Sequence, residues 1–438
     1  MKLKSVLGIS DNQVLHFKDV LRLPGAKKLV LAGLVGQMPI GMVTLPVTLA
    51  VVNVTSSYSS AGLALFTYMA GIGVTSPVWG RSIDRFGGGL VLKFMSIAFV
   101  LMSTLLTLTI IASAHYYLII AATAAVGATR PALMGAMQSL WTAMTPDEKT
   151  RNAAYSLHAQ ELGIVWVTGP LVVTGALVVF GEQLGPLIAI LAAGLLGGIG
   201  AVLVAQVWAT QDSRIHSVSA SGAPGDPDNA VRKPQRLYTR AYIIFLVSVS
   251  LFEMAVGAGI FSLTAYAERS GAPAIAGFLV AALFVGCIVG GFRSGAKGGK
   301  PPAANRYRLG LIALAGSFAV LAAMSNPFII AILLILGGMV LAETFTAQYA
   351  VTAILAPPSV RAEGFSWLGT LAALGGALGS ALAGFAIGQY HHSSAGLLVA
   401  SASAALGGLI FFHRRPRLSH IGDTKDEPTL HTREGTDS

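Results

Sequence analysis

The chain has 438 residues, of which 54% are hydrophobic and 11% are charged, and its formal net charge at pH 7 is +10. One or two soluble cores cannot bury so large an apolar fraction, so the composition excludes an ordinary soluble protein and predicts a multi-pass membrane protein. In a membrane protein the excess of basic residues indicates which side of the lipid bilayer each loop lies on, so no nucleic-acid partner is expected.

The predicted elements begin with residues 1–28, a cytoplasmic segment in which 11–23 form a helix lying on the membrane surface. Apolar runs of about 20 residues, long enough to cross a bilayer, then recur along the chain. A Ser-, Gly- and Pro-rich stretch at 210–237 predicts a cytoplasmic linker, and the polar tail at 413–438 is expected to be disordered. This predicts an all-α fold of twelve spans in two six-helix bundles, at 29–209 and 238–412. The first bundle contains 29–52, 60–79, 90–112, 116–142, 154–180 and 185–209, and the second contains 238–266, 273–292, 307–325, 327–355, 364–388 and 394–412.

Lysine and arginine are distributed very unevenly between the two sides of the predicted helices. Arg269 is on one side and Lys93 and Arg130 lie within spans, whereas the other 26 of the 29 basic residues fall on the opposite side. Because cytoplasmic loops carry the excess of basic residues, both termini and the linker are predicted to be cytoplasmic, in the cytoplasmic (inner) cell membrane.

The two halves also resemble each other in sequence. Adding 210 to a residue number carries Gly127 onto Gly337, Gln138 onto Gln348, Arg151 onto Arg361 and Gly169 onto Gly379. Six spans separate the copies, so both have the same orientation and should be related by an axis along the membrane normal.

A polar turn, GRSIDRFGGG, occupies residues 80–89 between the second and third spans. Together with the six-plus-six arrangement and the linker, this turn resembles the major facilitator superfamily over nearly the whole chain. Gly80, Asp84, Arg85 and Gly87 stand at the positions of that family's loop signature, although two further glycines replace its final basic pair. The resemblance implies alternating access, with the first, fourth, seventh and tenth spans lining a central cavity. It gives Asp84 and Arg85 the role of an ion-pair latch at the cytoplasmic gate.

The fifth span contains Gly169 and Pro170, with Gly163 before them and Gly175 after them. This pattern is similar to the Gly-Pro signature of the drug:proton antiporters within the family, although the closely following Gly pair is missing. The resemblance suggests antiport.

Ionisable residues inside a bilayer are rare and costly, which makes them functional candidates. Glu253 and Glu343 lie midway along the seventh and tenth spans, and Arg130 lies midway along the fourth. A carboxyl group in a low-dielectric cavity can take up and release a proton near neutral pH, so the two glutamates are candidates for proton coupling or substrate binding. Either could instead be a neutral structural residue or a partner of Arg130.

Arg130 precedes Pro131, whose ring removes a helical hydrogen bond, and it is predicted to act as a fixed positive charge. Its alternative role is an intramembrane ion pair with Glu161, for which a structural role is favoured. Gln37 lies on one polar face of the first span with two threonines and is a further candidate for the cavity lining. None of the nine histidines is placed near the centre of a span.

The sequence therefore predicts a secondary transporter, not an enzyme, that exports a small organic molecule or drug by proton antiport. The alternatives are a proton symporter importing a sugar, organic acid or other nutrient, and a membrane enzyme or sensor on the same scaffold. The proton gradient is the expected energy source, with no cofactor and no metal, because the chain has no GxxxxGK[ST] phosphate loop, no HExxH and one cysteine, Cys287. The expected partners are the substrate, protons and the lipid bilayer, and the expected state is a monomer.

Overall fold

The computed structural model describes residues 20–145, 148–220, 238–296, 302–356 and 361–413, and these form helices joined by short turns. No strand occurs in these ranges, so the predicted all-α class is confirmed. Most of the predicted surface helix at 11–23 lies outside the described residues, as do residues 221–237 of the linker and 414–438 of the tail.

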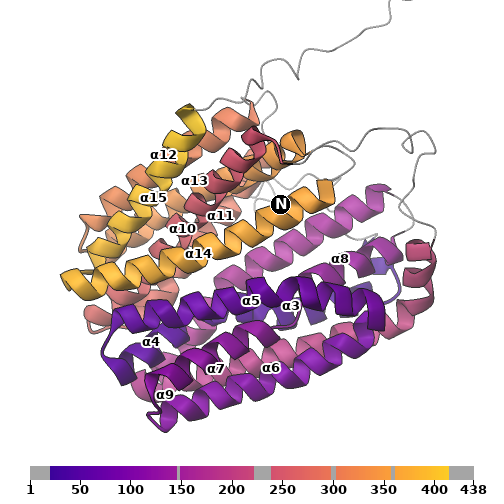
Figure 1. Ribbon diagram of the computed structural model, residues 1–438, viewed down its shortest axis with the longest axis horizontal. Helices are drawn as coiled ribbons and strands as arrows, with labels where there is room; N and C mark the ends of the chain where they lie inside the picture. The colour runs from indigo at the N-terminus through magenta and orange to yellow at the C-terminus, as the bar shows by residue number, and fades with distance from the viewer. Residues whose placement is uncertain (1–19, 146–147, 221–237, 297–301, 357–360, 414–438) are drawn as a thin grey trace, which may run out of the picture.

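The first bundle consists of six crossings built from seven helices (Figure 1). Two of these crossings each consist of two shorter helices. The helix α9 makes two crossings, because it folds back at Gly181, where φ is 76°. A left-handed backbone of this kind suits glycine, which has no Cβ to clash. The helices are α3 (Ala26–Met42) with α4 (Thr44–Thr55), α5 (Tyr58–Phe86), α6 (Gly88–Ile111), α7 (Tyr116–Thr129) with α8 (Leu133–Met144), and α9 (Glu148–Ala220).

The second bundle has one helix for each crossing (Figure 1). We call the end of the molecule where α10 begins the linker end, and the end where it finishes the far end. The helices are α10 (Arg240–Arg269), α11 (Ile275–Ala296), α12 (Ala303–Ala322), α13 (Pro327–Leu355), α14 (Arg361–Tyr390) and α15 (Ser393–His413).

Nine stretches in the described residues are long and apolar enough to span a membrane. One of them, Ala153–Gln211, contains both crossings of α9, and α11 has a shorter apolar stretch, Ile275–Gly291. When α9 is counted as two crossings and α11 and α12 are added, these stretches account for the twelve expected spans. The expected linker start at 210 differs from the structure, since α9 continues to Ala220. Its last residues are polar, and a helix can extend beyond the apolar layer with its backbone hydrogen bonds intact.

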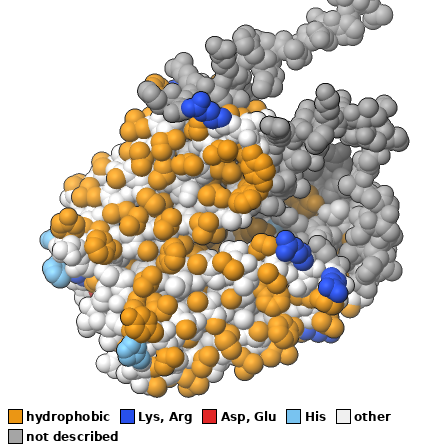
Figure 2. Space-filling model, viewed as in Figure 1, with side chains coloured by type: hydrophobic (Ala, Val, Ile, Leu, Met, Phe, Trp, Pro, Cys, Tyr) orange, Lys and Arg blue, Asp and Glu red, His pale blue; other side chains and the backbone are white. Residues whose placement is uncertain are grey.

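Apolar side chains cover the outer surface of both bundles. On α6 the exposed residues recur every three or four positions along one face: Leu90, Phe94, Ile97, Leu101, Leu105 and Leu108. Figure 2 shows hydrophobic side chains spread widely over one face of the molecule, with few lysines and arginines among them. A lipid environment would bury this surface, as expected for a multi-pass membrane protein.

The two bundles repeat one another in their close helix contacts. Gly169 on α9 packs against Gly41 on α3, and a methyl group at Gly169 would lie 2.7 Å from the Gly41 carbonyl carbon. The residue related by the offset of 210, Gly379 on α14, packs in the same way against the Met254 backbone on α10. Small residues allow such close approach of helix backbones in a membrane.

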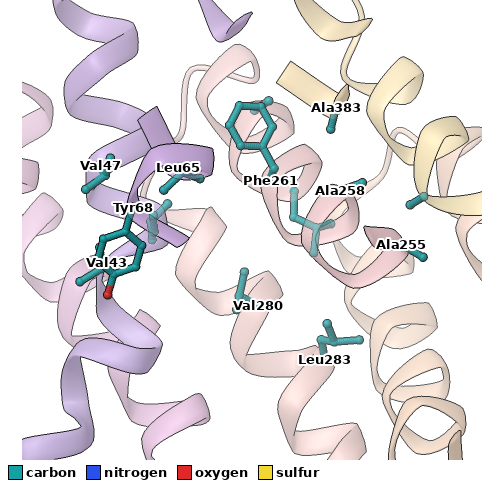
Figure 3. Packing of buried hydrophobic residues seen from close by; sticks show 14 of the residues in the cluster. Val43, Val47, Leu65, Tyr68, Ala255, Ala258, Phe261, Val280, Leu283 and Ala383 are labelled. Carbon is teal, nitrogen blue, oxygen red and sulfur yellow. The ribbon is translucent and has the colours of Figure 1, made fainter. Parts of the chain in front are cut away.

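The bundles meet through helices that come from both halves of the chain. The pairs in contact are α5 with α14, α9 with α11, and α4 with α10. Figure 3 shows one buried cluster that passes between them, with Val47 and Leu65 from the first bundle facing Phe261 and Val280 from the second. The hydrophobic core is therefore continuous across the junction.

The contacts between α5 and α14 are concentrated towards the far end. A methyl group at Gly384 would lie 2.5 Å from the Tyr58 carbonyl oxygen and 3.0 Å from the Gly62 Cα. Arg269 lies over the Tyr58 ring at 4.8 Å and donates a hydrogen bond to the His391 carbonyl. Towards the linker end, a Cβ on Gly73, Gly80 or Gly369 would have no described atom within 4 Å. In this conformation the two helices are packed together at the far end, and these three glycines towards the linker end face open space.

Candidate functional site

Glu253 lies near the middle of α10, where side chains from α12 and α13 converge on it. The Gln348 side chain hydrogen-bonds to its carboxyl group. The phenol groups of Tyr307 and Tyr349 lie close enough to interact with it electrostatically. The sequence indicated Glu253 but not these partners, because the rotation of each helix decides which side chains face one another.

Glu253 and the residue before it on α10, Phe252, have different environments. Phe252 is fully buried and packs edge-on against Tyr307 and Phe345, whereas Glu253 keeps partial exposure. The aromatic cluster fixes the rotation of α10 about this point, because large rings fit only one packing arrangement. Glu253 is therefore a half-buried acid on a rigid support.

Glu343 on α13 forms an ion pair with Arg306 at the linker-end start of α12, with 2.5 Å between Oε1 and Nη1. The two side chains are 30% and 15% exposed, respectively. The sequence placed Arg306 in a basic loop and did not link it to an acid. Its guanidinium compensates the Glu343 charge, so of the two candidate glutamates Glu253 is the one without a cationic partner in the described residues.

We expect the Arg306–Glu343 pair to couple α12 and α13. Arg306→Gln and Glu343→Gln should each lower the melting temperature, because each leaves a partly buried charge without its partner. The double variant should recover part of the loss, with a coupling energy of about 0.5–3 kcal/mol in a double-mutant cycle. Strictly additive losses in thermal unfolding would contradict this assignment.

Arg130 occupies the break between α7 and α8, where its ψ angle of 127° departs from helical geometry. The following Pro131 explains the break, since its ring excludes a helical conformation at the preceding residue. Arg130 and Gln37 line one small pocket, together with Pro131 and Met134. Among the described residues the Arg130 guanidinium has no hydrogen bond or ion pair. The structure thus brings together two of the predicted site residues from different helices.

Gln37 on α3 is 2% exposed and contacts its own helix and α8. Its Nε2 donates to the Gly33 carbonyl at 3.2 Å and lies 3.5 Å from the Met137 sulfur. Its Oε1 has no hydrogen-bond partner in the described residues. An acceptor buried in this way normally finds a donor, so this oxygen is available to one.

The expected ion pair between Glu161 and Arg130 does not form. Glu161 instead contacts His158, with 3.2 Å between Oε2 and Nδ1, and both residues are buried on α9. His158 was not among the residues predicted from the sequence, although its i, i+3 spacing from Glu161 was a usable signal, because residues three apart share a helix face. Arg130 lies in the break between α7 and α8 and faces the Gln37 pocket instead.

The polar turn at 80–89 contains the end of α5 and the start of α6. Gly87 has φ of 81°, which only glycine adopts readily, and its N–H bonds the Ile83 carbonyl to end α5. The Arg85 side chain is exposed and lies over the Phe86 ring at 5.2 Å. The Asp84 side chain lies outside what the structure describes, so the latch stays a prediction.

Gly169 and Pro170 lie where three helices meet. Gly169 touches Gly41 on α3, and the Pro170 carbonyl lies against Gly277 on α11 of the second bundle. One turn further along, Thr174 donates a hydrogen bond to the Ala274 carbonyl at 3.0 Å. This signature therefore lies at the junction between the bundles.

A second pocket, of about 380 Å³, lies at the far end and is lined by residues that include Tyr266, Arg269 and His391. Its lining on α10 begins at Leu263, ten residues along the helix from Glu253. This pocket belongs to the closed end of the molecule and contains none of the predicted site residues.

Comparisons with known proteins identify the class as a multi-pass membrane transporter. A sequence model described as the Major Facilitator Superfamily matches residues 29–328, more than half of the chain, and the chain belongs to that superfamily. Among curated protein sequences, none is similar enough to this chain to be matched.

Several solved transporter structures share the fold. A mutant of the nucleoside transporter NupG has a TM-score of 0.64 at 12% identity, covering 88% of this chain and 98% of that one. A mutant of the peptide transporter POT has a TM-score of 0.64 at 15% identity, covering 89% and 94%. A bacterial homologue of the iron transporter ferroportin, in an inward-facing state, has a TM-score of 0.63 at 14% identity, covering 88% and 97%. At these identities the likeness concerns the fold, and the drug:proton antiporter branch stays a prediction.

Proposed function

We propose that this transporter exports a small organic molecule in exchange for protons, with the proton gradient as its energy source and without a cofactor. The observation that carries the proposal is Glu253, an acid in the middle of α10 that interacts with the Gln348 side chain and lies within electrostatic range of two tyrosines. A carboxyl group in such a site changes its charge when it binds a proton, and that change can be linked to substrate binding.

The substrate would bind between the bundles, with Glu253 on one side and Arg130 on the other. Arg130 has no charged partner among the described residues and shares its pocket with Gln37. An arginine and an amide together favour a substrate with a hydrogen-bond acceptor or an anionic group. We propose that the remainder of the substrate is apolar, because the surrounding helices offer mainly apolar side chains.

Alternating access would use the contact between α5 and α14. With both termini and the linker in the cytoplasm, a conformation closed at the far end would open at the linker end to the cytoplasm, from which an exported molecule enters. Asp84 and Arg85 at the end of α5 would form the latch when that end closes. We propose that a monomer in the cell membrane carries out the whole cycle.

The test begins with a thermal-shift screen of the purified protein against drugs, nucleosides, peptides, sugars and organic acids, because a true ligand stabilises the folded state. Ligands that raise the melting temperature are then tested in proteoliposomes that contain a pH-sensitive dye. Antiport predicts that an imposed substrate gradient drives protons in the opposite direction. Proton flow in the same direction as the substrate would replace antiport by symport. Transport without any proton flow would overturn proton coupling.

A further inference from the structure

A second group of ionisable side chains is buried in the first bundle, away from Glu253. His158 and Glu161 on α9 are 4% and 2% exposed, and they contact each other at 3.2 Å. His158 Nε2 and Glu161 Oε1 are fully buried and have no hydrogen-bond partner in the described residues. Buried polar atoms without partners are rare in stable structural networks, so this pair needs a further explanation.

The α3 helix leaves room for the Glu161 carboxyl group. A methyl group at Gly33 would lie 2.8 Å from Glu161 Oε2, so only glycine allows the acid to lie this close to the α3 backbone. Met137 on α8 lies against the same glycine and separates the acid from Gln37, one turn further along α3. The described neighbours of the pair on α3 and α8 are therefore uncharged.

Among the side chains that the structure describes, no titratable group on the helices around α9 forms an ion pair with His158 or Glu161, and Lys28 on α3 instead donates a hydrogen bond to Gln206. Lys93 on α6 is exposed, Cys287 on α11 is half-buried, and no described contact joins either of them to the pair. Arg130 lies beyond Gln37, in the pocket that the two share. Within the described side chains, the charge balance of the pair therefore depends on its own protons.

We infer that His158 and Glu161 form a proton-binding site that holds one shared proton. With one proton the pair is neutral overall, as a hydrogen-bonded acid and imidazole or as an ion pair. Without it, an ionised carboxylate would remain in an apolar site with one hydrogen bond, which is costly. Loss of the proton thus weakens the packing of α9 against α3.

This site would add a second proton to the transport cycle and place it in the bundle opposite Glu253. Because α3 carries both Gly33 and Gln37, a movement of α3 away from α9 would also change the shape of the pocket that Gln37 shares with Arg130. Proton loss in the first bundle could in this way favour the conformation in which α3 and α9 are less tightly packed. The inference itself concerns proton binding by the resting protein and holds whether or not export is the direction of transport.

The test measures the melting temperature of the purified full-length protein from about pH 6 to about pH 9, without substrate. The folded pair holds one proton that the unfolded chain releases in this range, so the wild-type melting temperature should fall as the pH rises. Glu161→Gln keeps the shape of the side chain but removes the charge that proton loss would create. The melting temperature of this variant should therefore fall less steeply with pH than that of the wild type. Glu182→Gln, at an exposed acid on the same helix, serves as the matched control and should keep the wild-type slope.

A purely structural role predicts a different pattern. Glu161→Gln would then lower the melting temperature by the same amount at every pH, and that result would overturn the inference. If Glu161→Gln does not fold, the double variant His158→Leu with Glu161→Met replaces the pair by apolar side chains and should show the same flattened pH dependence. An unchanged slope in that variant would also overturn the inference. Neither result depends on transport, so the outcome is separate from the test of the proposed function.

Discussion

Glu253→Gln should reduce proton-driven transport to the background level in inverted membrane vesicles, while the protein remains folded. The substituted amide has nearly the same shape and can still accept a hydrogen bond from Gln348, but it cannot bind or release a proton. Exchange of labelled substrate for unlabelled substrate at equal concentrations should persist, because that reaction needs no net change in protonation. The measurement compares both fluxes in vesicles containing equal amounts of protein.

Glu182 provides a matched control for this prediction. It is an exposed acid in the far-end turn of α9, so Glu182→Gln should leave both fluxes and their pH dependence unchanged. If Glu253→Gln moved its substrate with the wild-type dependence on pH, Glu253 would not be the coupling residue. A loss of both fluxes would point instead to substrate binding by Glu253.

The site could be predicted only in part from the sequence, because a sequence shows which helix a charge lies on but not which way it faces. Glu253 and Arg130 were visible as rare charges inside apolar runs. The partner of Glu343 was not, since Arg306 lies on another helix. His158 could have been found from its spacing to Glu161, but its position near the end of a predicted span gave it no weight.

The fold was more predictable than the site, because bilayer thickness fixes the length of each span and apolar runs of that length are evident. Pro131 also marked the break between α7 and α8. The length of α9 was not predictable from hydropathy, since its last turns are polar and extend to Ala220. The sequence pattern also did not indicate which end of the bundles is closed, because it does not show where along their length α5 and α14 approach each other.

The closed far end depends on the absence of a side chain at Gly384. Its position against the Tyr58 and Gly62 backbones leaves no space for a Cβ, and backbone atoms cannot rotate away as a side chain could. Among the main helix contacts between the bundles in the described residues, this one lies at the far end of α5, where Arg269 also reaches Tyr58. A larger residue at this position should therefore act on the conformational equilibrium more than on the folding of either bundle.

Gly384→Val should shift the protein away from the conformation that is closed at the far end and should greatly slow transport. Overpacking of this kind costs about 1–3 kcal/mol, which corresponds to a change of about 5- to 150-fold in the equilibrium. Cys287→Ser gives a background without cysteine, and Ser380→Cys then places a probe at a residue that is 3% exposed on α14. Its reaction with a water-soluble maleimide should accelerate in Gly384→Val. Gly369→Val on the same helix is the control, since a Cβ there meets no described atom within 4 Å, and it should react at the background rate. Equal labelling rates in the two variants would show that Gly384 does not control closure of the far end.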